Sequence, residues 1–173
     1  MKAATFWRLV VSDESEFLDR IMALLGEAGI KYCLIGGQAV NAYVEPVVSL
    51  DLDVAIALDQ IAAAESLLRQ SFQVEHFPHS INVSEPESDL RVQIQTDPRY
   101  AGFVEHAEVR SVLGRDFPVA RIEDVLQGKV WAASDPGRRP SKRLKDFADI
   151  ARILESRPDL AHIVPPAIRA RLY

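Results

Sequence analysis

The sequence predicts an α+β (mixed α/β) fold in which helices flank a mixed sheet, and three observations support this class. A helical pattern opens the chain, short apolar strands and helices alternate through its middle, and only helical patterns follow residue 121. With 173 residues, of which 48% are hydrophobic, the chain can bury a sizeable core. We therefore expect a single domain over 1–173, with a core over 1–120 and a C-terminal helical extension over 121–173.

The first half of the chain contains the clearest periodic patterns. Ser12 and Asp13 precede apolar residues at helical spacing, which predicts a capped helix over 13–27. Strict alternation of apolar and polar residues predicts a strand over 49–58. The remaining expected elements are a strand over 32–35, a short helix over 38–43, a helix over 59–70, and strands over 72–74 and 81–83.

The second half begins with strand patterns and ends with helical ones. Alternating Leu90, Val92 and Ile94 predict a strand over 88–97, and Gly114 divides a hairpin over 109–119. The helices expected after it cover 122–133 and 141–154, and a short one follows Pro165 and Pro166. The residues expected to face the core from the helix over 141–154 are Leu144, Phe147, Ala151 and Leu154.

Composition excludes several classes of protein. The net charge of -5 argues against a surface that binds nucleic acid throughout, although a local basic patch remains compatible with it. Cys33 is the single cysteine, so the chain can form no internal disulfide and no cysteine-rich metal site. The N-terminus makes a poor signal peptide, and no apolar run approaches the roughly 20 residues of a membrane span. We expect a cytoplasmic protein.

Two aspartates interrupt the strand over 49–58. Asp51 and Asp53 alternate with apolar residues and so share one face, with Cα atoms about 6.6 Å apart. Like charges on one face repel, which favours a compensating cation, and Mg²⁺ prefers such oxygen ligands. The alternative is the solvated face of an ordinary strand. Upstream, Gly36 and Gly37 follow a strand and precede a helix, where exposed N–H groups favour a phosphate.

These motifs resemble those of the minimal nucleotidyltransferase fold, the superfamily shared with DNA polymerase beta. Within it, the chain is most similar to the small bacterial nucleotidyltransferases related to abortive-infection toxins. The resemblance implies Mg²⁺ or Mn²⁺, a nucleoside triphosphate (NTP) substrate and transfer of a nucleotidyl group to a hydroxyl of RNA, protein or a small molecule. An antitoxin partner is also implied. The implied residues are Asp51 and Asp53 for metal and catalysis, and Gly36, Gly37, Lys129 and Lys145 for the nucleotide; Asp89 is a further candidate for catalysis.

The C-terminal part extends the resemblance. It has a helix bearing Lys129, a basic loop over 134–140 and a helix with the K-D-x-x-D motif of Lys145, Asp146 and Asp149. A second interpretation treats Lys145 with Asp149, and Lys142 with Asp146, as i, i+4 salt bridges on a solvated helix. A basic cluster around this loop could receive a triphosphate or an RNA backbone. Its members are Arg138, Arg139, Lys142, Arg143 and Lys145.

The third acidic position departs from the pattern of the superfamily. The strand over 88–97 aligns Gln93 with a carboxylate that related enzymes use, and a neutral amide is a poorer ligand and no base. Asp89 shares the face of Gln93 and is the alternative third carboxylate. The rival hypothesis is therefore a non-catalytic binding module of the same fold, in a toxin–antitoxin pair. An ordinary structural domain with a polar sheet face is a third alternative.

Overall fold

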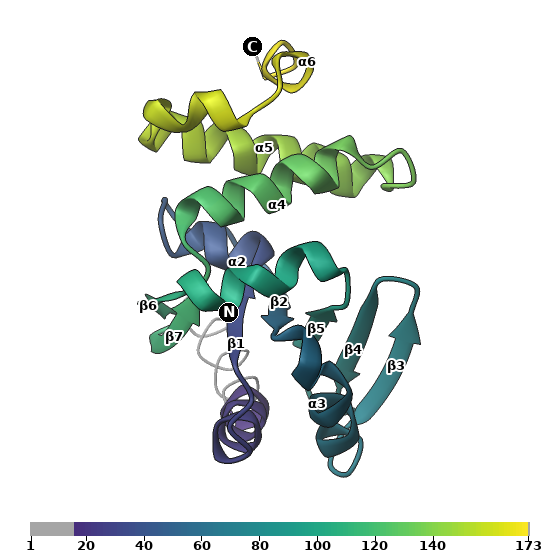
Figure 1. The fold of residues 1–173 in the computed structure, drawn as a ribbon. Helices are drawn as coiled ribbons and strands as arrows, with labels where there is room; N and C mark the ends of the chain where they lie inside the picture. The colour runs from purple at the N-terminus through teal and green to yellow at the C-terminus, as the bar shows by residue number, and fades with distance from the viewer. Residues whose placement is uncertain (1–15, 173) are drawn as a thin grey trace, which may run out of the picture. The chain divides into compact units, whose positions relative to one another are not determined.

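The computed structural model describes residues 16–172, which form two compact units (Figure 1). The first unit contains residues 16–32 and 50–104, and the second contains residues 33–49 and 105–172. Each unit combines strands with helices, and parallel and antiparallel strand pairs both occur. The predicted α+β class with a mixed sheet is therefore confirmed.

Four strands of the first unit follow the order β3-β4-β5-β2. β2 (Asp51–Ile56) pairs in parallel with β5 (Arg91–Gln95), whereas β3 (Gln73–Phe77), β4 (Ser80–Ser84) and β5 pair antiparallel. The short helix η1 (Leu58–Gln60) and α3 (Ile61–Leu68) connect β2 to β3. A nine-residue 3₁₀ segment, η2 (Pro98–His106), follows β5 and was not expected from the sequence.

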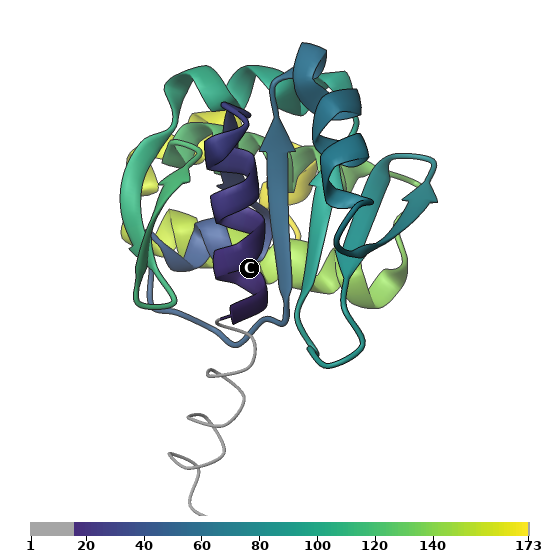
Figure 2. The ribbon, with the colours of Figure 1, turned by 90° about the horizontal axis from the view of Figure 1, so that it is seen from below.

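A helix over 16–27 and α3 lie on the same side of these strands (Figures 1 and 2). The helix confirms most of the range expected over 13–27, while its expected cap at Ser12 and Asp13 lies outside the described residues. Phe17 on this helix meets Phe72 edge to face, with 5.3 Å between ring centroids. The core that these elements share is apolar and includes Leu18, Ile21, Leu52, Val54, Ala64, Leu68, Ile81, Val83, Val92 and Ile94.

The strands of the second unit follow the order β1-β7-β6. β1 (Tyr32–Ile35), whose last three residues belong to this unit, pairs in parallel with β7 (Arg115–Val119). β7 forms a hairpin with β6 (Glu108–Val112) across Leu113 and Gly114, which have φ of 54° and 76°. Positive φ at both turn residues matches the twist of a two-residue hairpin.

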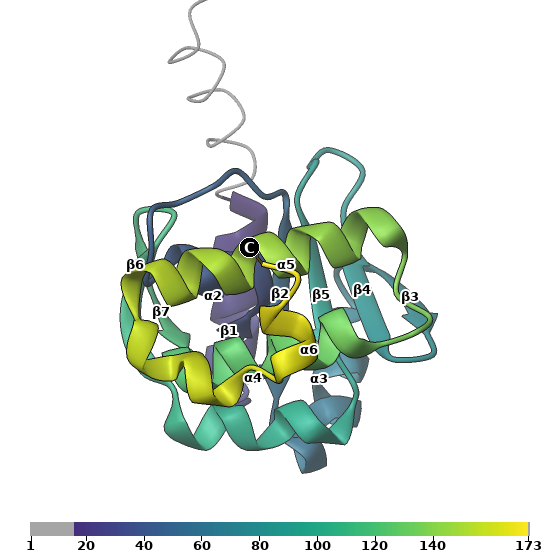
Figure 3. The ribbon, with the colours of Figure 1, turned by 90° about the horizontal axis from the view of Figure 1, so that it is seen from above.

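The helices of the second unit pack around α4 (Ile122–Ser134). α2 (Gly36–Asn41), α5 (Pro140–Ser156), η3 (Pro158–Ile163) and α6 (Pro166–Arg169) all contact α4 (Figures 1 and 3). The chain after α2 is tied to the residue that follows β7 because the Tyr43 hydroxyl donates to the Ala120 carbonyl at 2.8 Å. None of the helices in the described part of the chain combines the length and apolar character that a membrane span requires.

Candidate functional site

Asp51 and Asp53 lie on one face of β2, as the strand pattern predicts. Leu52 and Val54 alternate with them and are fully buried, while both aspartates are partly exposed. Side chains two residues apart share a strand face, so the first unit presents two carboxylates side by side. Asp51 forms an ion pair with Arg91 on β5, with 3.0 Å between Oδ1 and Nη2. This arginine offsets part of the repulsion between the two acids.

A row of polar side chains crosses three strands of the first unit. Gln93 on β5 lies opposite Asp53 on β2, and on its other side it lies opposite Asn82 on β4. Residues paired in this way share a face, so the three side chains form one row. Among the described residues, Asn82 Oδ1 is buried and has no hydrogen-bond partner. The row therefore offers neutral amides where a third carboxylate would complete an acidic cluster.

The chemistry of this row fits one hard cation. Mg²⁺ is usually held by one or two carboxylates together with substrate phosphates, and Asp51 and Asp53 supply that number. Gln93 contributes a neutral carbonyl oxygen, which does not hold a second cation as a carboxylate would. In the described part of the chain, no group of three or more His, Cys, Asp or Glu side chains is arranged to hold a metal ion. The acid pair therefore suits a cation that arrives with a phosphate-bearing ligand.

Asp89 lies outside the strand that was expected to carry it. β5 covers Arg91–Gln95 and not 88–97, because the chain bends at Asp89 before the strand begins. Asp89 is exposed there. Because it lies outside β5, the alternation along the strand does not place its side chain on the same face as Gln93. At the other end, Asp97 also lies beyond β5 and pairs with Arg99 at 2.7 Å. The hydrogen bond from Arg99 lowers the pKa of Asp97.

The two glycines start α2 directly after β1, two residues earlier than expected. Gly36 has a φ of 66°, a conformation in which residues with a Cβ are strained. Gly37 differs, because a Cβ built there would meet only Ser49 Oγ, at 3.9 Å. Backbone geometry therefore explains the glycine at position 36, whereas packing leaves room for a methyl group at position 37.

Side chains of α2 hold the segment that precedes the acid pair in the chain, which we call the 45–49 segment. Asn41 Nδ2 donates to the Val47 carbonyl at 2.6 Å, and Asn41 Oδ1 accepts from the Val47 amide at 2.9 Å. Gln38, which is 1% exposed, donates through Nε2 to the Ser49 carbonyl at 2.8 Å. These bonds fix the backbone at alternate residues, although Val47 itself is 56% exposed.

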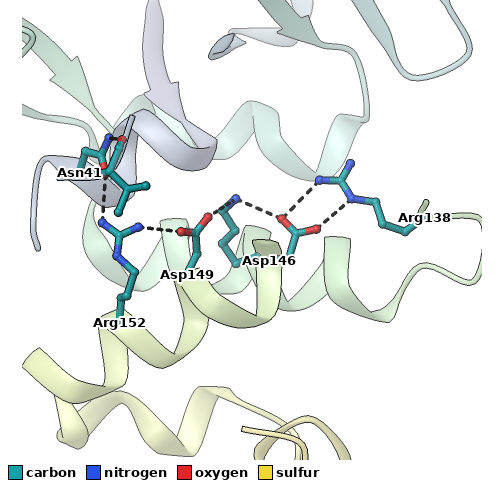
Figure 4. A network of polar contacts seen from close by, with 7 residues as sticks. Asn41, Arg138, Asp146, Asp149 and Arg152 are labelled. Atoms are coloured by element: carbon teal, nitrogen blue, oxygen red, sulfur yellow. Dashed lines mark hydrogen bonds and ion pairs between the residues drawn. The ribbon is translucent and has the colours of Figure 1, made fainter. Parts of the chain in front are cut away.

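A network of ion pairs joins α4, the basic loop and α5 (Figure 4). Lys129 Nζ lies 3.1 Å from Asp146 Oδ1 and 2.8 Å from Asp149 Oδ2. Each carboxylate also binds an arginine, Arg138 to Asp146 at 2.9 Å and Arg152 to Asp149 at 2.8 Å. The Lys129 side chain is only 10% exposed and that of Asp146 only 1%. Three cations and two carboxylates leave this network one positive charge.

The buried face of α5 differs from the expected one. Asp146, Ile150, Ile153 and Leu154 are buried, whereas Leu144 is 68% exposed, so the expectation that Leu144 faces the core is wrong. The interpretation that places Asp146 on a solvated helix face is also wrong, because its carboxylate is 1% exposed and binds Lys129 of α4. Lys145 is exposed on the same helix.

Arg152 connects the ion network to the 45–49 segment. Its Nη2 donates to Asn41 Oδ1 at 3.1 Å, while its Nη1 binds Asp149 (Figure 4). Nη2 also donates to the Glu45 carbonyl oxygen. Sequence reasoning missed Arg152 and Asn41. The i, i+3 spacing from Asp149 to Arg152 could have indicated their ion pair, but Arg152 and Asn41 are 111 residues apart in the chain.

Solved structures show the same fold. The solution structure of the antibiotic-resistance factor ANT(2'')-Ia superposes with a TM-score of 0.62 at 15% identity and covers 92% of this chain and 94% of that chain. A crystal structure of ANT(2'')-Ia in complex with adenylyl-2''-tobramycin gives 0.60 at 16% identity, covering 91% and 98%. An antigenic nucleotidyltransferase-like protein from Paracoccidioides brasiliensis gives 0.52 at 14% identity, covering 90% and 96%. These likenesses confirm the predicted nucleotidyltransferase fold.

Comparison at the level of sequence gives the family. No curated protein matches the chain. The family model described as nucleotidyl transferase AbiEii toxin of the type IV toxin–antitoxin system matches residues 17–172. The matched range contains the glycine pair, the acid pair and the K-D-x-x-D helix. The chain therefore belongs to the AbiEii family of nucleotidyl transferase toxins.

Proposed function

We propose that this chain is a Mg²⁺-dependent nucleotidyltransferase that moves a nucleotidyl group from an NTP to a hydroxyl acceptor. The observation that carries the proposal is the pair of carboxylates, Asp51 and Asp53, on one face of β2 in a member of the AbiEii family. Together with substrate phosphates they provide the oxygen ligands that Mg²⁺ or Mn²⁺ prefers. The bound cation would neutralise charge on the triphosphate and on the leaving pyrophosphate.

Four further residues are proposed to bind the nucleotide. Gly36 and Gly37 leave the backbone bare for close approach of phosphate. Two carboxylates already bind the ammonium group of Lys129, so we propose that it attracts the phosphates through the net charge of +1 of its ion network. Lys145 is exposed and provides a point charge for the distal phosphates.

The proposed reaction is an in-line displacement at the α-phosphorus. The acceptor oxygen forms a bond to phosphorus, the bond to the oxygen that bridges the α- and β-phosphates breaks, and pyrophosphate leaves with the electron pair. The proton of the acceptor hydroxyl passes to a base. Asp89 is the proposed base, and its exposed position before β5 allows contact with a bound acceptor.

The acceptor and the partners follow from chemistry and family. RNA, protein and small molecules all carry suitable hydroxyl groups, and the crystal structure of ANT(2'')-Ia contains an adenylylated small molecule. The basic loop, with Arg139 exposed, gives an RNA acceptor or a triphosphate complementary charge. We further propose a cytoplasmic location, where NTP is abundant, and an antitoxin partner, as the type IV family implies.

A second candidate function is a non-catalytic nucleotide-binding module. The observation that favours it is Gln93, which lies opposite Asp53 and supplies an amide in place of a base. Such a module would bind Mg-NTP through Asp51 and Asp53 without transferring the nucleotidyl group.

Thermal shift with the four NTPs, with and without Mg²⁺, tests nucleotide binding. A ligand at a hundred times its Kd stabilises the folded protein by about 2.7 kcal/mol, which raises the Tm by roughly 5–11 °C in a chain of this size. Asp51→Asn should abolish the Mg²⁺-dependent part of this shift, whereas Asp59→Asn, on the exposed η1 helix, should keep it. Equal shifts in both variants would contradict the proposed metal site.

Transfer from α-³²P-labelled NTP to RNA and protein fractions separates the two candidates. An enzyme labels an acceptor in a reaction that Asp51→Asn and Asp89→Asn both abolish. Binding without labelling of any fraction would favour the module, and labelling that survives Asp89→Asn would remove Asp89 as the base.

A further inference from the structure

We propose that Arg152 is a positioning residue that fixes the 45–49 segment and, through it, the start of the strand that carries Asp51. This proposal rests on the proposed role of Asp51 in holding the cation. It assigns part of the K-D-x-x-D helix a mechanical role that differs from phosphate binding. The contacts that carry it are the two ends of the Arg152 guanidinium, one on α5 and one on the segment.

The guanidinium of Arg152 bridges two groups at once. Nη1 lies 2.8 Å from Asp149 Oδ1, while Nη2 donates to Asn41 Oδ1 at 3.1 Å and to the Glu45 carbonyl oxygen. The rigid planar fork of arginine allows these bonds to form together, and a lysine ammonium has no equivalent geometry. Asp149 also pairs with Lys129 at 2.8 Å. The Arg152 guanidinium therefore joins the ion pairs of α4 and α5 to the backbone of the 45–49 segment.

The bonds to the segment continue along its backbone. Arg152 holds the carbonyl of Glu45, Asn41 holds both backbone groups of Val47, and Gln38 holds the carbonyl of Ser49. Ser49 precedes Asp51 by two residues, which span at most about 7 Å of extended chain. A displacement of the segment therefore passes along the chain to the start of β2.

Exposure of the segment shows why it needs these bonds. Val47 and Val48 are 56% and 60% exposed, so burial of apolar side chains contributes little to holding them. The side-chain bonds from Arg152, Asn41 and Gln38 are the restraints that the structure provides in place of packing. Loss of the Arg152 fork releases the Glu45 end and leaves Asn41 without its charged donor.

Hydrogen exchange of the peptide over 44–50 tests the restraint without reference to activity. Arg152→Gln should speed exchange in this peptide by roughly 10- to 100-fold, the range expected when hydrogen bonds from a charged group are lost. Arg152→Lys should give nearly the same increase, because it keeps the charge beside Asp149 and loses the fork. The matched control is Arg157→Gln, since Arg157 caps the C-terminal end of the same helix and pairs with exposed Asp159. Unchanged exchange in Arg152→Gln, or full rescue by lysine, would overturn the proposal.

Nucleotide binding with and without Mg²⁺ tests the consequence for Asp51. Titration of the whole chain with a non-hydrolysable NTP should show that Arg152→Gln and Arg152→Lys each weaken binding about tenfold with Mg²⁺ and less than twofold without it. Equal weakening in both conditions would overturn the link to Asp51. If the wild type itself shows no Mg²⁺-dependent binding, the proposed function fails, and the exchange measurement still decides whether Arg152 restrains the segment.

Discussion

Replacement of Lys129 by methionine removes the cation that Asp146 and Asp149 share. Loss of one partner from a buried ion pair costs about 3–5 kcal/mol when the remaining charge is left alone. Here each carboxylate keeps an arginine, Arg138 or Arg152, so we expect a smaller loss of about 2–3 kcal/mol. In a chain of this size that loss corresponds to a fall in Tm of roughly 4–12 °C.

Urea denaturation followed by circular dichroism measures this loss, with thermal unfolding as a second measurement. Lys145→Met is the matched control, because it makes the same change on α5 at an exposed position, and it should stay within about 0.5 kcal/mol of the wild type. A loss in Lys129→Met no larger than in the control would refute the reasoning, because the network would then contribute no net stability.

Three further predictions concern single residues. Gly36→Ala should lower the free energy of unfolding by about 1–2 kcal/mol because Gly36 has a positive φ. Gly37→Ala should keep the stability of the wild type, because a Cβ fits there, and should lose affinity for a triphosphate. Urea denaturation measures the first quantity and nucleotide titration the second. Burial, reinforced by the charge of Asp124, raises the pKa of the Cys33 thiol from 9.0 to about 12. The free energy of unfolding should therefore fall as the pH rises from 9 towards 12, because the thiol ionises in the unfolded chain first. Alkylation of Cys33 should be far slower in the native protein than in the unfolded chain. Gln93→Asp should raise the rate of nucleotidyl transfer relative to the wild type in the labelling assay, and a lower rate would show that the amide serves the reaction as it is.

The patterns that predicted the fold are local and strong. Alternation placed Asp51 and Asp53 on one face of β2, and the hairpin over 109–119 follows from a glycine between two alternating runs. Sequence patterns failed to predict the structure at residues 98–106 and the buried face of α5. Residues 98–106 form a 3₁₀ segment that no periodic pattern indicated. Leu144 lies on a face of α5 turned away from the buried Asp146, Ile150, Ile153 and Leu154.

The polar contacts of α5 were less accessible to sequence reasoning. Salt bridges at i, i+4 can be read from a sequence, but Asp146 pairs with Lys129, 17 residues earlier on another helix, and with Arg138 of the preceding loop. Which carboxylate a lysine meets depends on how α4 and α5 pack, and no local pattern encodes that packing. The glycine pair and the acid pair could be predicted because each depends only on the local sequence and on the strand or turn that this sequence forms.

The anchoring of alternate residues after α2 leaves the chain no slack between α2 and Ser49. Tyr43, Glu45, Val47 and Ser49 are each bound, through the hydroxyl of Tyr43 and the backbone of the other three. A deletion or insertion of one residue would move every later anchor out of step with its side-chain partner. Substitutions at the intervening residues would leave all four anchors in place. The number of residues between the glycine pair and Ser49 is thus set by the geometry of this segment, and tolerance to change here should depend on length far more than on side-chain identity.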